Sequence, residues 1–373
     1  MPLAALLRRR IAESGSLGVA EYMAEALGHP EHGYYATRDP LGAAGDFTTA
    51  PEISQVFGEL IGAWCVEVWR AMGAPNPVRL VELGPGRGTL IADAGRMWRH
   101  VAPEFTLTAR LHLVETSPPL RARQRATLAA AATPPTWHAT LAEVPEGPMI
   151  LLANEFFDAL PVRQYVRRAG TWRERLVGMA PTGDSFAFVD GSVVDPAGAP
   201  EASGEDVRRQ LTVAADGEIL ELCPAAEVLA ADIGGRLADH GGAALIVDYG
   251  PTHSALGDTL QAVRGHRYAD PLATPGQADL SHHVDFQRLG AAAERSGARV
   301  WGPVPQGLLL GRIGLAARVQ ALVAAAPSAS QADAIRGAVR RLVHPGRMGV
   351  LFKGLAIAHP SLPVPPGFIA SPP

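Results

Sequence analysis

The sequence predicts an α/β fold, in which a mostly parallel sheet is covered by helices. Three observations support the prediction. Short, continuous apolar runs recur along the chain, helical stretches separate the first three runs, and 47% of the 373 residues are apolar, which is enough for a sizeable core. Continuous apolar strands that alternate with helices are typical of a parallel sheet buried on both faces.

The first 75 residues are predicted to form a helical layer, whose clearest helix is the amphipathic stretch 53–72. Before that helix, residues 42–52 (GAAGDFTTAPE) are rich in Gly and Thr and follow no period. A linker is one interpretation of this stretch. Long loops inside an apolar layer are more often functional, so we expect a role in binding.

The sheet is predicted from apolar runs that end in a polar residue or a glycine. Parallel strands are expected at 78–83, 110–115, 149–153 and 243–249. Beyond residue 250, helices are expected at 284–296 and 308–326, and strands at 299–304 and 349–358.

The third and fourth apolar runs lie about 90 residues apart, too far for a plain crossover. Alternating segments at 163–166, 171–177 and 185–189 predict a small antiparallel insertion in this gap. We therefore expect a helical N-terminal layer with its loop at 1–75, a sheet domain at 76–358 with an insertion at about 160–240, and a Pro-rich tail at 359–373.

Composition excludes several classes of protein. The 33 basic and 37 acidic side chains give a net charge of −4, so nothing favours nucleic-acid binding, and no apolar stretch is long enough for membrane insertion. Apolar residues precede the basic ones in the first 15 residues, the reverse of a signal peptide, so an ordinary first helix and a cytoplasmic location are expected. A weak amphipathic targeting helix is the alternative. Lys353 is the only lysine, which we interpret as a coding bias toward arginine.

The first chemical motif is a glycine-rich turn between a strand and a helix, with glycines at Gly84, Gly86 and Gly88. Glycines allow a ligand to approach the backbone, and the helix that follows presents free N–H groups. The Gly-x-Gly-x-Gly spacing, with Glu82 two residues before it, resembles the first motif of S-adenosylmethionine-dependent methyltransferases. A turn without a ligand is the alternative.

Glu115 ends the second predicted strand. An acid at the tip of the strand beside a glycine loop can accept hydrogen bonds from both hydroxyls of a ribose. An N-terminal helix acid that interacts with the helix dipole is the alternative. Together with the glycine turn, the position favours the ribose role.

The segment after the third strand reads Asn154, Glu155, Phe, Phe, Asp158. Carboxylates three residues apart can point the same way if the segment is helical or a turn. Paired hydrogen bonds from them could grip a planar cation such as guanidinium. Alternatively, one of the acids caps the next element.

Two further groups are ambiguous. Asp46, in the Gly- and Thr-rich loop, could contact the amino-acid end of a cofactor, or its loop could simply cap the helix at 53–72. His282 and His283 precede an acid, which suggests a metal site. Adjacent helical residues do not share a face, however, and no Cys or His cluster completes a coordination sphere. A helix start is the better interpretation, and no metal is predicted.

Longer motifs resemble the MidA family over roughly residues 10–358. They are GYY (33–35), GDFTTAPEISQVFGE (45–59), LVELGPGRGTL (80–90), LVETSP (113–118), NEFFDALPV (154–162), VDYG (247–250), RGHRY (264–268) and HVDF (283–286). The family includes a mitochondrial protein-arginine methyltransferase that assists assembly of respiratory complex I. The resemblance implies a class I methyltransferase fold (Rossmann-like), in which the last strand, at 349–358, is reversed and the N-terminal loop covers the cofactor.

The resemblance also implies a function: methyl transfer from S-adenosyl-L-methionine to arginine on a partner protein, for which a respiratory-complex subunit is one candidate. The expected catalytic residues are Glu155 and Asp158. The expected cofactor contacts are Asp46, Glu82, Gly84, Gly86, Gly88, Glu115 and Asn154. The alternatives are a non-catalytic assembly factor with a vestigial pocket and a methyltransferase for small molecules. A homo-oligomer is compatible with the sequence.

Overall fold

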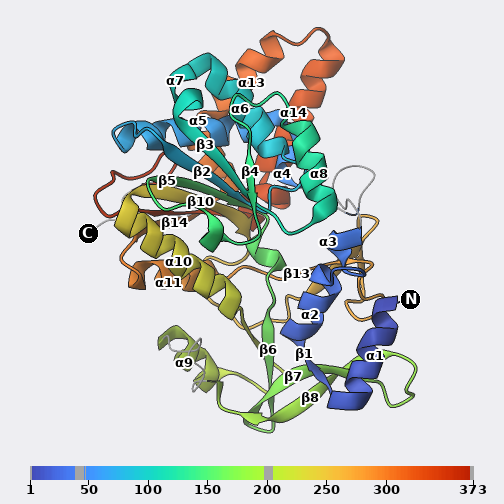
Figure 1. The fold of residues 1–373 in the computed structure, drawn as a ribbon. Helices are drawn as coiled ribbons and strands as arrows, with labels where there is room; N and C mark the ends of the chain where they lie inside the picture. Colours follow the sequence, from blue (N-terminus) through green and yellow to red (C-terminus); the bar gives the residue numbers. More distant parts are fainter. Residues whose placement is uncertain (1, 38–45, 47, 197–204, 370–373) are drawn as a thin grey trace. The chain divides into compact units, whose positions relative to one another are not determined.

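The computed structural model describes residues 2–37, 46, 48–196 and 205–369 (Figure 1). The chain divides into two compact units, and each is described by itself. The first unit consists of Met1–Phe47, Asp158–Val228 and His253–Asp285. The second consists of Thr48–Phe157, Leu229–Thr252 and Phe286–Pro373.

The second unit contains a seven-stranded sheet in the order β14-β15-β10-β5-β2-β3-β4. The strands are β2 (Val78–Leu83), β3 (Ala109–Val114), β4 (Thr136–His138), β5 (Met149–Asn154), β10 (Gly242–Tyr249), β14 (Arg299–Pro305) and β15 (Phe352–Ala358). The pairs from β10 to β4 are parallel, whereas β15 is antiparallel to both β10 and β14. The predicted parallel sheet with a reversed last strand is confirmed.

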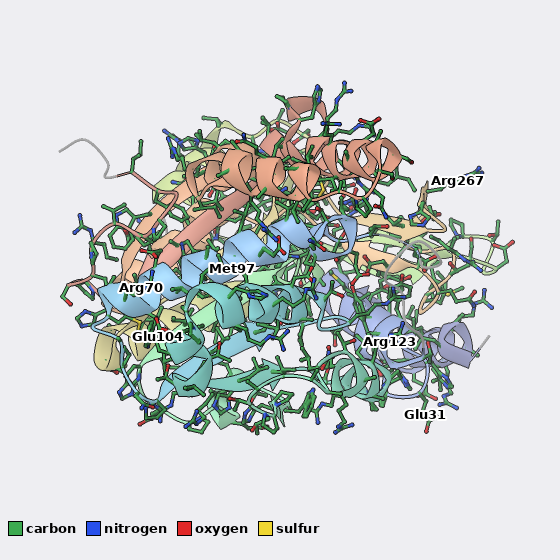
Figure 2. All side chains as sticks on the ribbon, turned by 90° about the horizontal axis from the view of Figure 1, so that it is seen from above. Glu31, Arg70, Met97, Glu104, Arg123 and Arg267 are labelled. Carbon is green, nitrogen blue, oxygen red and sulfur yellow. The ribbon has the colours of Figure 1, made fainter. Side chains whose placement is uncertain are left out.

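Helices cover both faces of this sheet. They are α4 (Ala50–Ile53), α5 (Gln55–Ala71), α6 (Thr89–Val101), α7 (Pro103–Thr108), α8 (Pro118–Thr127), α11 (Phe286–Arg295), α12 (Gln306–Arg312), α13 (Leu315–Ala324) and α14 (Ala329–Val343). In Figure 1, α5 and α6 lie on the opposite face of the sheet from α11. Figure 2 shows Arg70 of α5 near Glu104 of α7, where an ion pair of 3.8 Å links the two helices.

Burial explains why these strands form. All eight residues of β10 are buried, so the run is continuously apolar up to Asp248. The helices begin at recognisable caps: the Ser117 hydroxyl accepts the Leu120 N–H at the start of α8, and Ser54 caps α5 in the same way. Such local signals fix the ends of the elements that carry the site.

The helix predicted at 308–326 is wrong, because two helices occupy this stretch. The break lies at Gly314, which has a φ of +110° and caps α13. A left-handed residue ends a helix at little cost only when it is glycine. No single helix in the described ranges is long and apolar enough to cross a membrane. The α12–α13 pair meets the criteria of length and composition together, but is bent by 73°.

The first unit is built on antiparallel sheets. Its strands are β1 (Leu17–Gly18), β6 (Arg163–Arg168), β7 (Thr171–Met179), β8 (Phe186–Val194), β9 (Ile219–Leu222), β11 (Gln261–Arg264), β12 (Arg267–Ala269) and β13 (Asp279–Ser281), and its helices are α1 (Pro2–Ser14), α2 (Val19–Gly28), α3 (Tyr34–Thr37) and α9 (Glu205–Val213). The predicted antiparallel segments are present as β6, β7 and β8.

The chain passes between the units at five points, of which one falls inside a 3-10 turn (Phe157–Ala159) and one inside α10 (Pro224–His240). The domain boundaries expected from the sequence at 75 and 358, and the insertion at about 160–240, stay a prediction. Residues 42–45 and 47 of the predicted loop and residues 370–373 of the tail lie outside the described residues.

Candidate functional site

The glycine loop follows β2 and leads into α6. Gly84, Gly86 and Gly88 have φ angles of +57°, +55° and +79°, a region that other residues enter only with strain. A Cβ on Gly84 would lie 2.7 Å from Cδ2 of Phe156. Gly88 is the N-terminal cap of α6, so the loop directs the first N–H groups of the helix toward a ligand.

Glu115 follows β3 and is 8% exposed. Its Oε1 accepts the Ser117 N–H at 2.8 Å, and its Oε2 accepts the Gln124 amide at 3.1 Å. Burial raises the pKa of Glu115, while these hydrogen bonds oppose the rise. The carboxylate is therefore held rigidly at the carboxyl end of its strand.

Gln124 joins Glu115 to the glycine loop, a role that sequence reasoning missed. The same Nε2 donates to the Gly86 carbonyl at 2.8 Å, and the Gln124 Oε1 accepts the Trp137 indole N–H at 2.8 Å. The side chain is fully buried. A polar residue on the covered side of α8 was the only available signal.

Glu82 is a buried acid near the end of β2, and no basic side chain among the described residues pairs with it. Burial, and secondarily the Glu115 charge, raise its pKa to about 8. Its Oε2 has no hydrogen-bond partner among the described residues. A buried acceptor left open in this way costs free energy unless a ligand satisfies it.

Helix α4 connects two loops at the carboxyl edge of the sheet. The Ala50 N–H donates to Glu155 Oε1 at 2.7 Å, after β5. Glu52 accepts the Thr89 hydroxyl and forms an ion pair of 3.6 Å with Arg87, in the loop after β2. The Thr- and Pro-rich segment thus ties the glycine loop to Glu155.

Glu155 has a φ of +50°, a strained conformation for a residue with a side chain. Its Oε1 also accepts the Asn154 amide at 3.3 Å, while Oδ1 of Asn154 is buried and has no partner within the described ranges. Burial, with a smaller contribution from Asp248, raises the pKa of Glu155 to about 8, although the Ala50 N–H opposes the rise. Strain of this kind is typical of functional sites.

Asp248 organises the segment after Glu155. Its Oδ2 accepts the N–H groups of Phe156 at 3.1 Å and Phe157 at 2.9 Å. It is fully buried at the end of β10. In the sequence, Asp248 stands out only as part of the VDYG motif, although an acid at the end of an apolar strand is itself a signal of a functional position.

The remaining predicted residues, Asp46 and Asp158, belong to the first unit. Asp46 accepts the Tyr34 hydroxyl and the Gly265 N–H, both at 2.7 Å. Asp158 is buried, and its carbonyl accepts the His282 N–H at 3.0 Å. Glu82, the three glycines, Glu115, Asn154 and Glu155 therefore share the second unit's carboxyl edge, and the two aspartates are placed only within their own unit.

The paired histidines take part in backbone contacts. The ring nitrogens of His282 lie 2.9 Å from the His283 carbonyl and 3.0 Å from the Leu160 carbonyl. No group of three or more metal-binding side chains occurs in the part of the chain that the structure describes.

Known proteins resemble this chain over most of its length. Residues 60–304 match a family model described as an S-adenosyl-L-methionine-dependent methyltransferase. The chain is 38% identical to the mitochondrial protein arginine methyltransferase NDUFAF7 of Mus musculus and 39% identical to the Drosophila melanogaster homolog, in both cases over 95% of this chain and 84% of the relative. A protein from Burkholderia thailandensis, solved bound to S-adenosyl-homocysteine, has a TM-score of 0.82 and 30% identity over 98% of this chain and 93% of that one.

The comparisons correct one expectation. A cytoplasmic location was predicted, but the mouse, fly and zebrafish relatives are all named as mitochondrial, so the prediction is wrong. The physical reason is that a receptor directs a protein to its compartment by recognising a targeting signal. The order of apolar and basic residues near the N-terminus counts only against a secretory signal peptide, so it does not separate the cytoplasm from a mitochondrion.

Proposed function

Since the chain belongs to the MidA family of S-adenosylmethionine-dependent methyltransferases, we propose that its methyl acceptor is an arginine side chain of a partner protein. The observation that carries the proposal is Glu155. A half-buried carboxyl group in a strained conformation, with a raised pKa, follows β5 at the sheet edge where ligands of α/β proteins bind. The names of the relatives support arginine as the acceptor. The family resemblance makes a respiratory-complex subunit the first partner to test.

The class I methyltransferase fold and the S-adenosyl-L-methionine cofactor are those of the family, as predicted. The residues of this chain fit the cofactor on two grounds. The glycine loop runs at φ angles of +55° to +79° without a Cβ, which leaves its backbone open to a ligand, and the buried Oε2 of Glu82 and Oδ1 of Asn154 are open acceptors for donors of a ligand. When bound, the cofactor supplies an activated methyl group.

Each proposed contact uses a stated group. Gly84, Gly86 and Gly88 offer backbone to the cofactor, and the Glu115 carboxylate accepts from ribose hydroxyls. Glu82 and Asn154 contribute their open oxygens. Asp46 stays a proposed contact, because each carboxylate oxygen has a second lone pair beyond the one used by Tyr34 or Gly265.

On the acceptor side, Glu155 has two tasks. A guanidinium is always charged in proteins, so it must be oriented and must lose a proton as its nitrogen is methylated. A carboxylate with a raised pKa binds that proton more tightly than an ordinary glutamate does, which suits a general base. A guanidinium beside Glu155 also favours the ionised form. Asp158 is the second proposed acceptor-side carboxylate.

The proposal is tested by methylation with isotope-labelled cofactor, using partner proteins found by mass spectrometry of cells with and without the gene. We expect labelled arginine on at least one partner. Gly84→Ala should abolish cofactor binding in calorimetry, because its Cβ would collide with Phe156.

Gly73→Ala is the matched control, because Gly73 has a φ of +82° and open space around it. It carries the same backbone strain and should bind normally. Labelled product on a small molecule but never on protein would overturn the proposal. Cofactor binding without any transfer would leave a non-catalytic assembly factor.

A further inference from the structure

One edge of the second unit displays apolar side chains that the proposed function does not use. Leu308 of α12 is 47% exposed, and Val350 and Leu351, just before β15, are 49% and 46% exposed. The start of α12 packs against the end of α14 and the turn that follows it: a Cβ on Gly307 would lie 2.8 Å from the Val343 carbonyl and 3.4 Å from Cα of Gly349. The three apolar side chains therefore belong to one local surface.

Basic side chains accompany this apolar surface. Arg340 and Arg341 occupy the last turn of α14, and Arg347 follows in the π-helical turn η5 (Pro345–Gly349). All three are exposed, and none forms an ion pair with the residues that the structure describes. The helix dipole favours cations in a last turn, but Arg347 lies beyond the helix. We call the surface formed by Leu308, Arg340, Arg341, Arg347, Val350 and Leu351 the basic–apolar edge.

The only lysine of the chain fixes this edge. Lys353 is 7% exposed, and its ammonium donates to the carbonyls of Gly250 at 2.7 Å, Val350 at 2.8 Å and Leu351 at 2.9 Å. Three donors that diverge from one nitrogen suit three carbonyls, whereas a planar guanidinium does not. Coding bias therefore does not account for this residue. Because Lys353 holds the backbone at 350–351, both apolar side chains stay displayed.

The basic–apolar edge lies next to the proposed acceptor site at Glu155. Phe352 pairs with Tyr249 of β10, and β10 pairs with β5, which Glu155 follows. Two strand spacings are about 10 Å, so Leu351 lies within the reach of a short peptide from Glu155. Helix α14 also packs against α4, whose Ala50 binds the Glu155 carboxylate. Arg341 is close enough to counteract the rise in the pKa of Glu155.

We propose that the basic–apolar edge docks the partner segment that flanks the acceptor arginine, and that this segment carries acidic and apolar side chains. The inference rests on the proposed function and names its substrate class. Three exposed guanidinium groups repel a basic flank and attract an acidic one, which selects partners mainly by steering and by rejecting like charge. The apolar side chains give a central contact for a leucine-sized residue.

The test uses fluorescent peptides with one arginine, flanked either by two glutamates and a leucine or by two lysines and a leucine. Binding is measured by anisotropy without cofactor. The acidic peptide should bind wild-type protein at least about tenfold more tightly. In the triple variant Arg340→Glu, Arg341→Glu, Arg347→Glu, the preference should reverse. Leu351→Ser should weaken binding of both peptides while the acidic preference is kept.

Arg99→Glu is the matched control. Arg99 is exposed in the last turn of α6, whereas it is the first turn of this helix that lies at the site. It should leave both affinities unchanged. Equal binding of the two peptides, or no binding of either, overturns the inference. The inference is also overturned if the triple variant loses binding to phosphatidylglycerol vesicles but keeps the peptide preference of wild type, because the basic–apolar edge would then face a membrane. Peptides that bind with the expected preference but are never methylated contradict the proposed function alone.

Discussion

Two carboxylates, one in each compact unit, differ in how many of their oxygens accept a hydrogen bond. Both oxygens of Asp46 in the first unit already accept strong donors, from Tyr34 and Gly265. Glu82 in the second unit is buried, has a pKa raised to about 8, and has one oxygen without a partner among the described residues. A satisfied carboxylate stabilises its own fold, whereas an open buried acceptor is free for a ligand.

The largest effect, on turnover, should come from Glu155, a further acid in the second unit. Glu155→Gln keeps the shape and the oxygen that accepts the Ala50 N–H, but removes the charge and the proton acceptor. We expect near-normal cofactor affinity and a loss of turnover of roughly 100-fold or more. Turnover on the methylated partner, alongside calorimetric titration of the cofactor, measures both quantities.

The pH profile adds a control for Glu155. Because its pKa is raised to about 8, the free enzyme gains the carboxylate as pH rises, so wild-type kcat/KM should increase up to about pH 8. The Gln variant should lack that increase. Asp158→Asn should reduce turnover less than Glu155→Gln does; wild-type rates in both variants would move the acceptor site elsewhere.

Glu115→Ala should have the next largest effect. Losing ribose hydrogen bonds to a charged acceptor should cost roughly 1.5–3 kcal/mol, about tenfold to a hundredfold in cofactor affinity. The Ser117 N–H and the Gln124 amide also lose their acceptor, so a modest fall in melting temperature is expected. A large fall in melting temperature with unchanged affinity would mean that Glu115 is structural.

Asp46→Asn should have a smaller effect on affinity, about tenfold or less, because the carboxylate already serves Tyr34 and Gly265. Isothermal titration and a melting curve separate the two roles. An affinity loss as large as that of Glu115→Ala would contradict the contrast between the units.

The smallest effect concerns stability. Glu82 keeps its proton in the folded protein up to about pH 8, whereas the unfolded chain releases it above about pH 4.5. The free energy of unfolding is therefore highest below about pH 4.5, and Glu82 lowers it as the pH rises through about 8. Glu82→Gln has no ionisable group at this position, so it avoids the cost of a buried charge at high pH. The melting temperature of the variant minus that of wild type should therefore rise by several degrees between pH 5 and pH 9. A constant difference across that range would show that Glu82 is not buried in the protonated form.

Much of the fold was predictable from local pattern. The runs at 78–83 and 243–249 became strands because they are buried on both faces, which makes them continuously apolar. The break inside 308–326 was not predictable, because a glycine within a helical pattern ends the helix only where packing rewards it. The exposed basic–apolar edge was equally hidden, since exposure is not a local property.

By itself the sequence determined where the strands end and which chemical groups stand there: a glycine turn after β2, Glu115 after β3, and Asn154 and Glu155 at the end of β5. These are consequences of neighbours in the chain. Only the tertiary structure decided which of these groups are already satisfied. The N–H that binds Glu155 comes from Ala50, 105 residues away, and sequence spacing does not report a hydrogen bond between segments that meet only in the folded sheet.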